Sequence, residues 1–269
     1  MRRSTVVARR SGIEWTDITW NPTTGCSKVS PGCEHCYAER LSLRFGWSGK
    51  PWTAPNAPEN VRLHFERLSS PRKWKQPARV FVNSMSDLFH DLVPFEFLSL
   101  VFDVMEDTPQ HTYQILTKRP DRMRTFVTKR LSADPGRPSQ SSPNVWLGTS
   151  AEDQRRTDER LPVLLDTPAA VRFVSCEPLL GPLDLTTYLC GLDWIIDGGE
   201  SGPDRRPASP DWFRSIRDQC RLAGVAYFHK QGNSSRPGGD RLLDDKTWEQ
   251  FPVAGATNLY EAENGAAGI

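Results

Sequence analysis

Three cysteines near the N-terminus are the residues whose types and spacing most clearly suggest chemistry. Cys26, Cys33 and Cys36 fall within eleven residues, in the stretch TTGCSKVSPGCEHCYAE, and the last two form a CxxC pair. Thiolates this crowded would repel one another in a folded loop unless a cation or a metal cluster held them. The glycines and the proline among them predict a loop, and the residues after Cys36 have helical spacing. The sequence therefore predicts a metal-binding loop that leads directly into a helix.

The number of cysteines in this loop bears on which metal it would hold. A structural zinc site is closed by four protein ligands, whereas a site that must meet a substrate keeps one position open. Iron–sulfur clusters are usually held by four cysteines, so a cluster held by three would leave one iron free for an external ligand. Two alternatives stay open. Zinc could recruit His35 or His64 as a fourth ligand, and the CxxC pair could be a redox dithiol, which would leave Cys26 without a role.

The rest of the chain predicts a scaffold of alternating strands and helices. Short apolar strands alternate with amphipathic helices, which is typical of a parallel sheet covered by helices on its outer face. Such units predict an α/β fold, a TIM-like full or partial (β/α)6–7 barrel of parallel strands with outer helices. No GxGxxG motif follows the first strand, which weakens a doubly wound alternative. Strand ends are expected near residues 22, 84, 117, 149, 176, 198 and 230.

Composition shifts along the sequence suggest how the chain is divided. We expect a flexible basic tail over residues 1–11 and the barrel over residues 12–233. A proline- and tryptophan-rich insertion is expected at residues 46–78, and a C-terminal extension at residues 234–269. The insertion's tryptophans could stack on a base or plug the edge of the barrel.

Composition and charge narrow the functional classes. Net charge is +1, so no protein-wide basic field indicates nucleic acid, although residues 118–130 are locally basic. On a helix such a run is most often a solvated face, and a phosphate-binding patch is the alternative. No apolar run approaches the roughly 18 residues of a membrane span, so we expect no membrane partner. Six cysteines, three of them clustered, suggest a reducing, cytoplasmic location rather than a disulfide scaffold.

Each predicted strand after the first ends in a polar or glycine-rich cluster: NSMSD, TKRP, GTSAED, SCEP, DGGES and HKQGN. In a barrel all these ends open on one face, which is where active sites lie, and the cysteine loop would join them there. Three residues at these ends are candidate catalytic groups. Cys176 could donate a hydrogen atom, and Glu200 and His229 could contact a substrate. An inert buried thiol and a structural histidine are the ordinary alternatives.

Several segments together resemble a known family. IEWTDITWNPTTGC, FVNSMSDLF, ILTKRP, WLGTSAED, SCEPLLGP and DGGESG are similar to a phage-associated family of three-cysteine-motif proteins of uncertain function, along most of residues 12–233. The three-cysteine loop after the first strand also resembles that of the radical S-adenosylmethionine superfamily. There the cysteines hold a [4Fe–4S] cluster, and its free iron chelates the cofactor's methionine group. The superfamily usually has three and then two residues between its cysteines, whereas here there are six and then two.

The resemblance implies an enzyme that uses S-adenosylmethionine and an external electron donor to generate a 5′-deoxyadenosyl radical. It implies cofactor contacts from the segment after the second strand, which here lacks the superfamily's usual glycines, and from groups at other strand ends. Lys118 and Arg119 could pair with the cofactor carboxylate. Helix capping and salt bridges are the ordinary alternatives, above all for Asp87 and Glu152. The cofactor-binding candidates are His35, Asn83, Ser84, Asp87, Lys118, Ser150, Glu152 and Glu177.

The substrate is less well indicated. The phage association of the similar family, the basic segment and the tryptophans favour a nucleic acid or nucleotide, with repair or modification of a base as the reaction. Two other classes stay open. One is a zinc-binding, non-redox protein that binds or hydrolyses nucleic acid with carboxylates such as Asp87, Glu152, Glu177 and Glu200. The other is a non-catalytic barrel that serves a partner protein.

Overall fold

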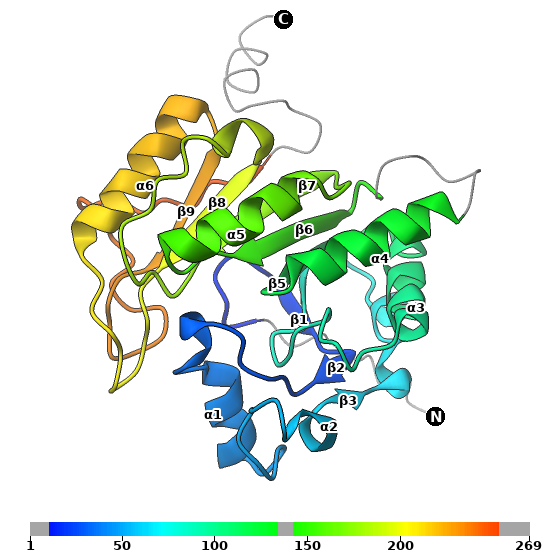
Figure 1. Ribbon diagram of the computed structural model, residues 1–269. Coiled ribbons are helices and arrows are strands. Elements are labelled where there is room, and N and C mark those ends of the chain that lie inside the picture. Colours follow the sequence, from blue (N-terminus) through cyan, green and yellow to red (C-terminus); the bar gives the residue numbers. More distant parts are fainter. Residues whose placement is uncertain (1–10, 134–141, 253–269) are drawn as a thin grey trace, which may run out of the picture.

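The computed structural model describes residues 11–133 and 142–252. The predicted basic tail lies outside the described residues except for its last position, as do residues 253–269 of the predicted extension. Seven parallel strands form one sheet in the order β1-β4-β5-β6-β7-β8-β9, and the sheet curls into a half-barrel (Figure 1). The partial α/β barrel predicted from the sequence is confirmed. The strands are β1 Ile18–Trp20, β4 Arg79–Val82, β5 Thr112–Thr117, β6 Val145–Ser150, β7 Val171–Cys176, β8 Trp194–Gly198 and β9 Ala226–Gln231.

Helices follow the strands and cover the outer face of the half-barrel (Figure 1). They are α3 Phe95–Glu106, α4 Pro120–Ser132, α5 Gln154–Leu165 and α6 Pro210–Ala223. The sequence sets their ends. The side chains of Asp153 and Ser209 accept backbone N–H bonds at the starts of α5 and α6, and Gly224 ends α6 with φ 68°. Such caps satisfy backbone groups that a helix leaves unpaired at its ends.

The two faces of the sheet bury two different cores. Because side chains alternate along a strand, Val80 and Ile115 point outward to the helices, while Phe81 points inward. The inner core is mostly aromatic. Trp194 is fully buried there, with its ring 6.1 Å from those of Trp15 and Trp146. Bulky rings thus fill the interior, and the polar strand ends are left to form a site at one edge.

The cysteine loop and the predicted insertion lie together at one end of the half-barrel (Figure 1). A two-stranded antiparallel sheet joins them, formed by β2 Thr23–Thr24 and β3 Arg62–Leu63. The short helices of this region are α1 Tyr37–Arg44 and α2 Ala57–Asn60. Its 3-10 turns are η1 Pro31–Cys33, η2 Phe65–Arg67 and η3 Pro71–Lys73. A further 3-10 turn, η4 Leu189–Gly191, precedes β8. Of the tryptophans around the insertion, Trp52 is buried and Trp47 is exposed. Among the described helices, none has the length and apolar character needed to cross a membrane.

Candidate metal centre and adjoining cavities

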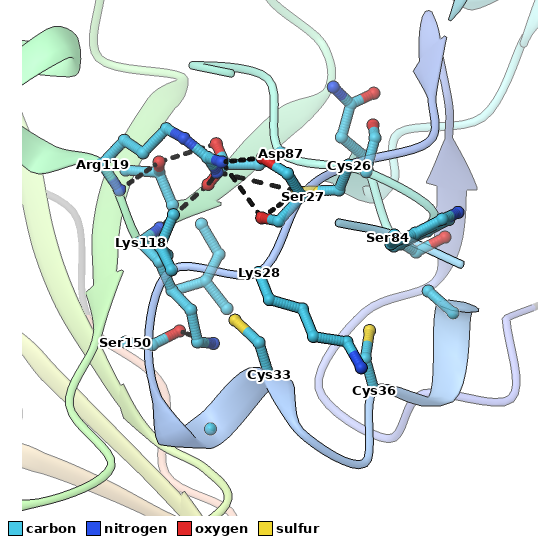
Figure 2. A pocket seen from close by; sticks show the side chains of 18 of the residues that line it. Cys26, Ser27, Lys28, Cys33, Cys36, Ser84, Asp87, Lys118, Arg119 and Ser150 are labelled. Carbon is cyan, nitrogen blue, oxygen red and sulfur yellow. Dashed lines mark hydrogen bonds and ion pairs between the residues drawn. The ribbon is translucent and has the colours of Figure 1, made fainter. Parts of the chain in front are cut away.

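Three free thiols line one cavity at the carboxyl ends of the strands. Cys26, Cys33 and Cys36 all border a cavity of about 150 Å³, together with residues that follow β4 and β5 (Figure 2). Cys33 ends η1 and Cys36 caps the N-terminus of α1, so two local turns present these sulfur atoms. The structure therefore brings the three cysteines together with the strand ends, as the βα order implies.

Arg119 lies directly against the first cysteine. Its Nη1 atom donates to Asp87 Oδ2 at 3.0 Å and to Cys26 Sγ at 3.6 Å, and its Nη2 atom donates to the carbonyl and hydroxyl oxygens of Ser27, both at 3.1 Å (Figure 2). Burial, with a further contribution from the charge of Asp87, raises the pKa of the Cys26 thiol to about 12, although Arg119 acts in the opposite direction. A thiol with this pKa is neutral at neutral pH, and binding to a metal would stabilise its thiolate.

Asp87 is engaged by the protein itself. Besides Arg119, its carboxylate accepts hydrogen bonds from Thr117 Oγ1 at 2.7 Å and from the backbone N–H groups of Phe89 and Lys118 at 3.0 and 3.1 Å. Four donors leave this carboxylate little capacity for a ligand. The structure thus gives Asp87 the role of fixing Arg119 and the start of the loop after β5.

Asn83 joins the end of β4 to the beginning of the cysteine loop, and Ser84 joins it to Tyr37 at the start of α1. Asn83, with φ 65°, accepts from the backbone N–H of Thr23 at 3.3 Å and donates to its hydroxyl at 2.7 Å. The hydroxyl of Tyr37 donates to the carbonyl of Ser84 at 2.6 Å. Both residues line the first cavity. They hold the loop in place and border the space next to the thiols.

Two clamps from distant strands hold the middle of the loop. Glu152 Oε1 accepts from the backbone N–H of Gly32 at 3.3 Å, and its Oε2 pairs with Arg160 at 2.9 Å. Arg206 Nη2 donates to the carbonyl of Pro31 at 3.0 Å and to Glu200 at 2.8 Å. Arg160 and Arg206 were not identified from the sequence, where no local pattern links them to a loop more than a hundred residues away.

Glu200 is the centre of the second clamp. Its Oε2 accepts from His35 Nδ1 at 2.9 Å, and Arg206 donates through both its backbone and its guanidinium. Burial raises the pKa of this carboxyl, but the bonds from Arg206 and His35 outweigh burial and lower the pKa to about 2. Glu200 is therefore a carboxylate at neutral pH, and its contacts make it a residue that positions the loop rather than a proton donor.

A second, larger cavity of about 580 Å³ adjoins the first. The two share Cys36, Tyr37, Lys118 and Ser150 among their lining residues. Lys118 Nζ donates to Ser150 Oγ at 2.9 Å (Figure 2).

The larger cavity has both charged and aromatic lining residues. Glu177 and Lys230 line it and form an ion pair with each other. His35 and Glu200 line it as well, and the rings of Trp15 and Phe81 form part of its wall. The space has the apolar wall and few polar groups typical of a ligand site.

Two of the three catalytic candidates lie on the other face of the sheet. Cys176 and His229 are buried and line neither of the adjoining cavities. His229 Nδ1 bonds Asp197 at 2.7 Å, Tyr227 donates to the same carboxylate at 2.7 Å, and Cys176 packs in the outer core. Burial raises the pKa of the Cys176 thiol well above its usual range. The structure thus places both residues away from the two cavities.

The locally basic segment forms α4, where its arginines have protein partners. Arg122 donates to the carbonyl of Val93 and lies over the ring of Phe95, and Arg130 pairs with Asp103 and Glu106. Arg124 pairs with acids at 3.1 and 3.4 Å. These contacts favour the solvated, packed face over the phosphate-binding patch.

The two histidines considered as a fourth zinc ligand are engaged elsewhere. Both ring nitrogens of His64 have partners, Thr24 at 2.9 Å and Glu66 at 3.1 Å, and His35 bonds Glu200. Within residues 11–133 and 142–252, no group of three or more His, Cys, Asp or Glu side chains is arranged to hold a metal ion. Three thiols with no fourth ligand do not fit a closed zinc site. As donors they fit an iron–sulfur cluster, in which each thiolate binds a different iron.

Fold and site together define an α/β half-barrel protein that gathers three free thiols of one loop at the carboxyl ends of its strands. The chain belongs to the family described as "Protein of unknown function (DUF5131)", whose model matches residues 10–252.

Two solved structures of spore photoproduct lyase are similar to this chain at low identity. One is a cysteine-to-serine mutant, with 13% identity and a TM-score of 0.46. The other is complexed with dinucleoside spore photoproduct, with 14% identity and a TM-score of 0.48. Each match covers 81% of this chain and 64% of the other, so this chain spans less than two thirds of their length. At these values the likeness carries no functional argument. No curated protein matches the sequence.

Proposed function

We propose that the protein is a radical S-adenosylmethionine enzyme in which Cys26, Cys33 and Cys36 hold a [4Fe–4S] cluster with one iron left for the cofactor. The observation that carries this proposal is that three thiols of one loop border a single cavity at the strand ends, and that this cavity adjoins a larger one. When bound, the cluster and S-adenosylmethionine would supply one-electron reduction and hydrogen-atom abstraction, with the electron coming from an external donor.

The protein's own residues hold the cysteine loop rigidly around the cluster position. Glu152 and Arg206 fix its backbone at Gly32 and Pro31, and Arg119 fixes it at Ser27. A metal site is effective when such supporting contacts orient its ligands. The clamps come from the ends of β6, β8 and β5, so the barrel itself sets the distances among the thiols.

Lys118 is the best-placed group for the cofactor's charged end. It lies where the two cavities meet, and its ammonium is held toward the thiol side by Ser150. An ammonium there suits a carboxylate, because the partly buried setting strengthens the attraction. Glu177 and Lys230 face the larger cavity and could bind amino or hydroxyl groups after exchanging their mutual ion pair. The aromatic wall would exclude water from the reacting groups.

The zinc alternative has weaker support. Zinc–sulfur bonds of about 2.3 Å require the ligands to converge on one point. In the described part of the chain no side-chain group does so, and His64 is held by Thr24 and Glu66. A cluster separates its thiolates over several irons and needs no fourth protein ligand, which matches the donors present.

For the substrate, the exposed surface next to the larger cavity favours a nucleic acid or nucleotide. Arg40 and Arg44 of α1 line this cavity, and Phe45 and Trp47 follow directly. These two rings stack with centroids 5.1 Å apart while remaining 56% and 66% exposed. Exposed aromatic rings beside arginines are typical of surfaces that stack unpaired bases and attract their phosphates. We therefore propose α1, and not the basic helix α4, as the element that contacts the substrate.

Anaerobic reconstitution tests the proposal. The full chain would be treated with iron and sulfide, and iron, sulfide and zinc would be counted per chain beside the visible absorption spectrum. We expect about four irons and four sulfides per chain with broad charge-transfer absorption, and loss of both in Cys26→Ala, Cys33→Ala and Cys36→Ala. Cys220→Ala is the matched control, because that thiol belongs to the buried face of α6 and lines neither cavity. Retention of zinc with no iron uptake would overturn the proposal.

A further inference from the structure

The three thiols of the loop differ in their polar surroundings. Cys33 Sγ lies 3.9 Å from the hydroxyl of Ser30, and Cys36 is the N-cap residue of α1, with no capping hydrogen bond to its side chain. Cys26 instead receives a bond from the guanidinium of Arg119 at 3.6 Å. Among the described residues, Cys26 is the loop cysteine with a hydrogen bond from a cationic side chain.

A second cation lies close by but is directed elsewhere. Figure 2 shows Lys28 extending between Cys33 and Cys36. Its ammonium pairs with Glu39 at 2.9 Å and donates to the carbonyl of Glu34 at 3.3 Å. Lys28 thus bonds oxygen atoms, whereas Arg119 bonds a sulfur atom of the loop.

Arg119 is held so firmly that its direction is a property of the fold. Its side chain is 9% exposed, and it bonds Asp87 and both oxygen atoms of Ser27 as well as the sulfur. The same Nη1 atom contacts both Cys26 and Asp87, so the thiol and the carboxylate share one nitrogen of the guanidinium. The sulfur, the guanidinium and the carboxylate form one contact group, in which the side chains of Arg119 and Asp87 are largely shielded from solvent.

We propose that Arg119 sets the reduction potential of the cluster through Cys26, and that Asp87 limits this effect. The inference rests on the proposed function, because it needs the cluster. Reduction places one electron from the external donor on the cluster and transfers no proton. A hydrogen bond and a positive charge at a ligand sulfur stabilise the added negative charge, which raises the potential. The carboxylate of Asp87 acts in the opposite direction, and low exposure keeps both effects from being screened.

The two variants that follow from this arrangement should shift the potential in opposite directions. Arg119→Gln removes the positive charge, so the reduction potential of the cluster should become more negative. We expect a shift of about 59 mV, which for one electron corresponds to a tenfold lower ratio of reduced to oxidised cluster. Asp87→Asn leaves the guanidinium unopposed, so its potential should become more positive. Arg119→Lys keeps the positive charge, so its reduction potential should lie close to that of the wild type. A purely structural role for Arg119 would not give shifts of opposite sign.

The experiment is a redox titration of the reconstituted full chain, followed by electron paramagnetic resonance, with iron counted for every variant. Arg124→Gln is the matched control, because it removes the same charge from the exposed side of α4 and should leave the potential unchanged. An unchanged potential in Arg119→Gln, or shifts of the same sign in Arg119→Gln and Asp87→Asn, would overturn the inference alone. A wild-type chain that takes up no cluster would overturn the proposed function, and this inference with it.

Discussion

The carboxylate of Glu152 accepts a hydrogen bond from the backbone N–H of Gly32, 3.3 Å away, and so ties the cysteine loop to the end of β6. Glu152 is fully buried, and its other oxygen pairs with Arg160. A Cβ atom at Gly32 would lie 3.0 Å from the Glu152 carboxyl carbon, so a side chain there would crowd the carboxylate and displace it. The position of the thiols therefore depends on a residue 120 positions further along the chain.

Replacing Glu152 should both destabilise the fold and loosen the loop. Glu152→Ala leaves Arg160 buried without its partner, which typically costs about 3–5 kcal/mol of unfolding free energy. It also releases Gly32, so the thiols should react faster with an alkylating reagent. Urea unfolding and timed alkylation measure the two effects. Glu159→Ala is the control: its ion pairs are exposed to solvent, so its stability should stay close to that of the wild type. A Glu152→Ala chain as stable as wild type would contradict the role assigned to this pair.

The clamp made by Glu200 should give the protein a defined dependence on acid. Its carboxyl has a pKa of about 2 in the folded protein, against an ordinary value of 4.5. A carboxyl whose pKa is lowered by folding stabilises the protein above its unfolded pKa and loses that contribution as the pH falls toward the folded pKa. Unfolding free energy should therefore decline between about pH 4.5 and pH 2.

Urea unfolding at several pH values checks this dependence. Glu200→Gln cannot ionise, so its stability should change less over the same range than that of the wild type. Glu59→Gln is a suitable control, because that carboxylate pairs with Lys50 on the surface. Parallel pH curves for wild type and Glu200→Gln would show that the Arg206 and His35 contacts do not stabilise the ionised form.

The sequence predicted which segments form the site better than it predicted which side chains of those segments point into it. The cysteine loop and the polar strand ends were predictable because parallel strands bring their carboxyl ends to one edge. The face on which Cys176 and His229 lie was not predictable, because strands buried on both sides are apolar throughout and their pattern does not reveal which residues point inward. Lys118 and Ser150 point to the inner side and line the larger cavity. Arg206 reaches the site from the loop between β8 and α6, and no local sequence pattern predicts the course of that loop.

If the exposed rings beside α1 stack on bases, their removal should weaken binding of single-stranded oligonucleotides. Trp47→Ala should cost about 1–3 kcal/mol of binding free energy, the usual range for one stacked base. Arg44→Gln should instead reduce the salt dependence of binding, because it removes a phosphate contact. Fluorescence anisotropy at several salt concentrations measures both. Leu222→Ala, which removes an exposed side chain from α6, is the control. Equal affinities for wild type and Trp47→Ala would exclude stacking there.

The aromatic interior predicts a strong penalty for a single added methyl group. A Cβ atom at Gly148 of β6 would lie 2.6 Å from the ring of Phe173 on β7. Gly148→Ala should therefore lower the unfolding free energy by about 1–3 kcal/mol, the usual cost of overpacking a core. Urea unfolding measures the loss. Gly181→Ala is the matched control, since its Cβ would meet nothing within 4 Å. A Gly148→Ala chain as stable as the control would show that the interior is packed less tightly than described.

An iron left open to the cofactor should be visible in the magnetic spectrum of the cluster. The electron paramagnetic resonance spectrum of the reduced, reconstituted protein would be recorded before and after adding S-adenosylmethionine. A free iron coordinated by the cofactor should change the spectrum, and adenosine, which lacks the amino and carboxylate groups of the cofactor, should not change it. An identical spectrum with and without saturating S-adenosylmethionine, from a protein that carries a full complement of iron, would contradict the account.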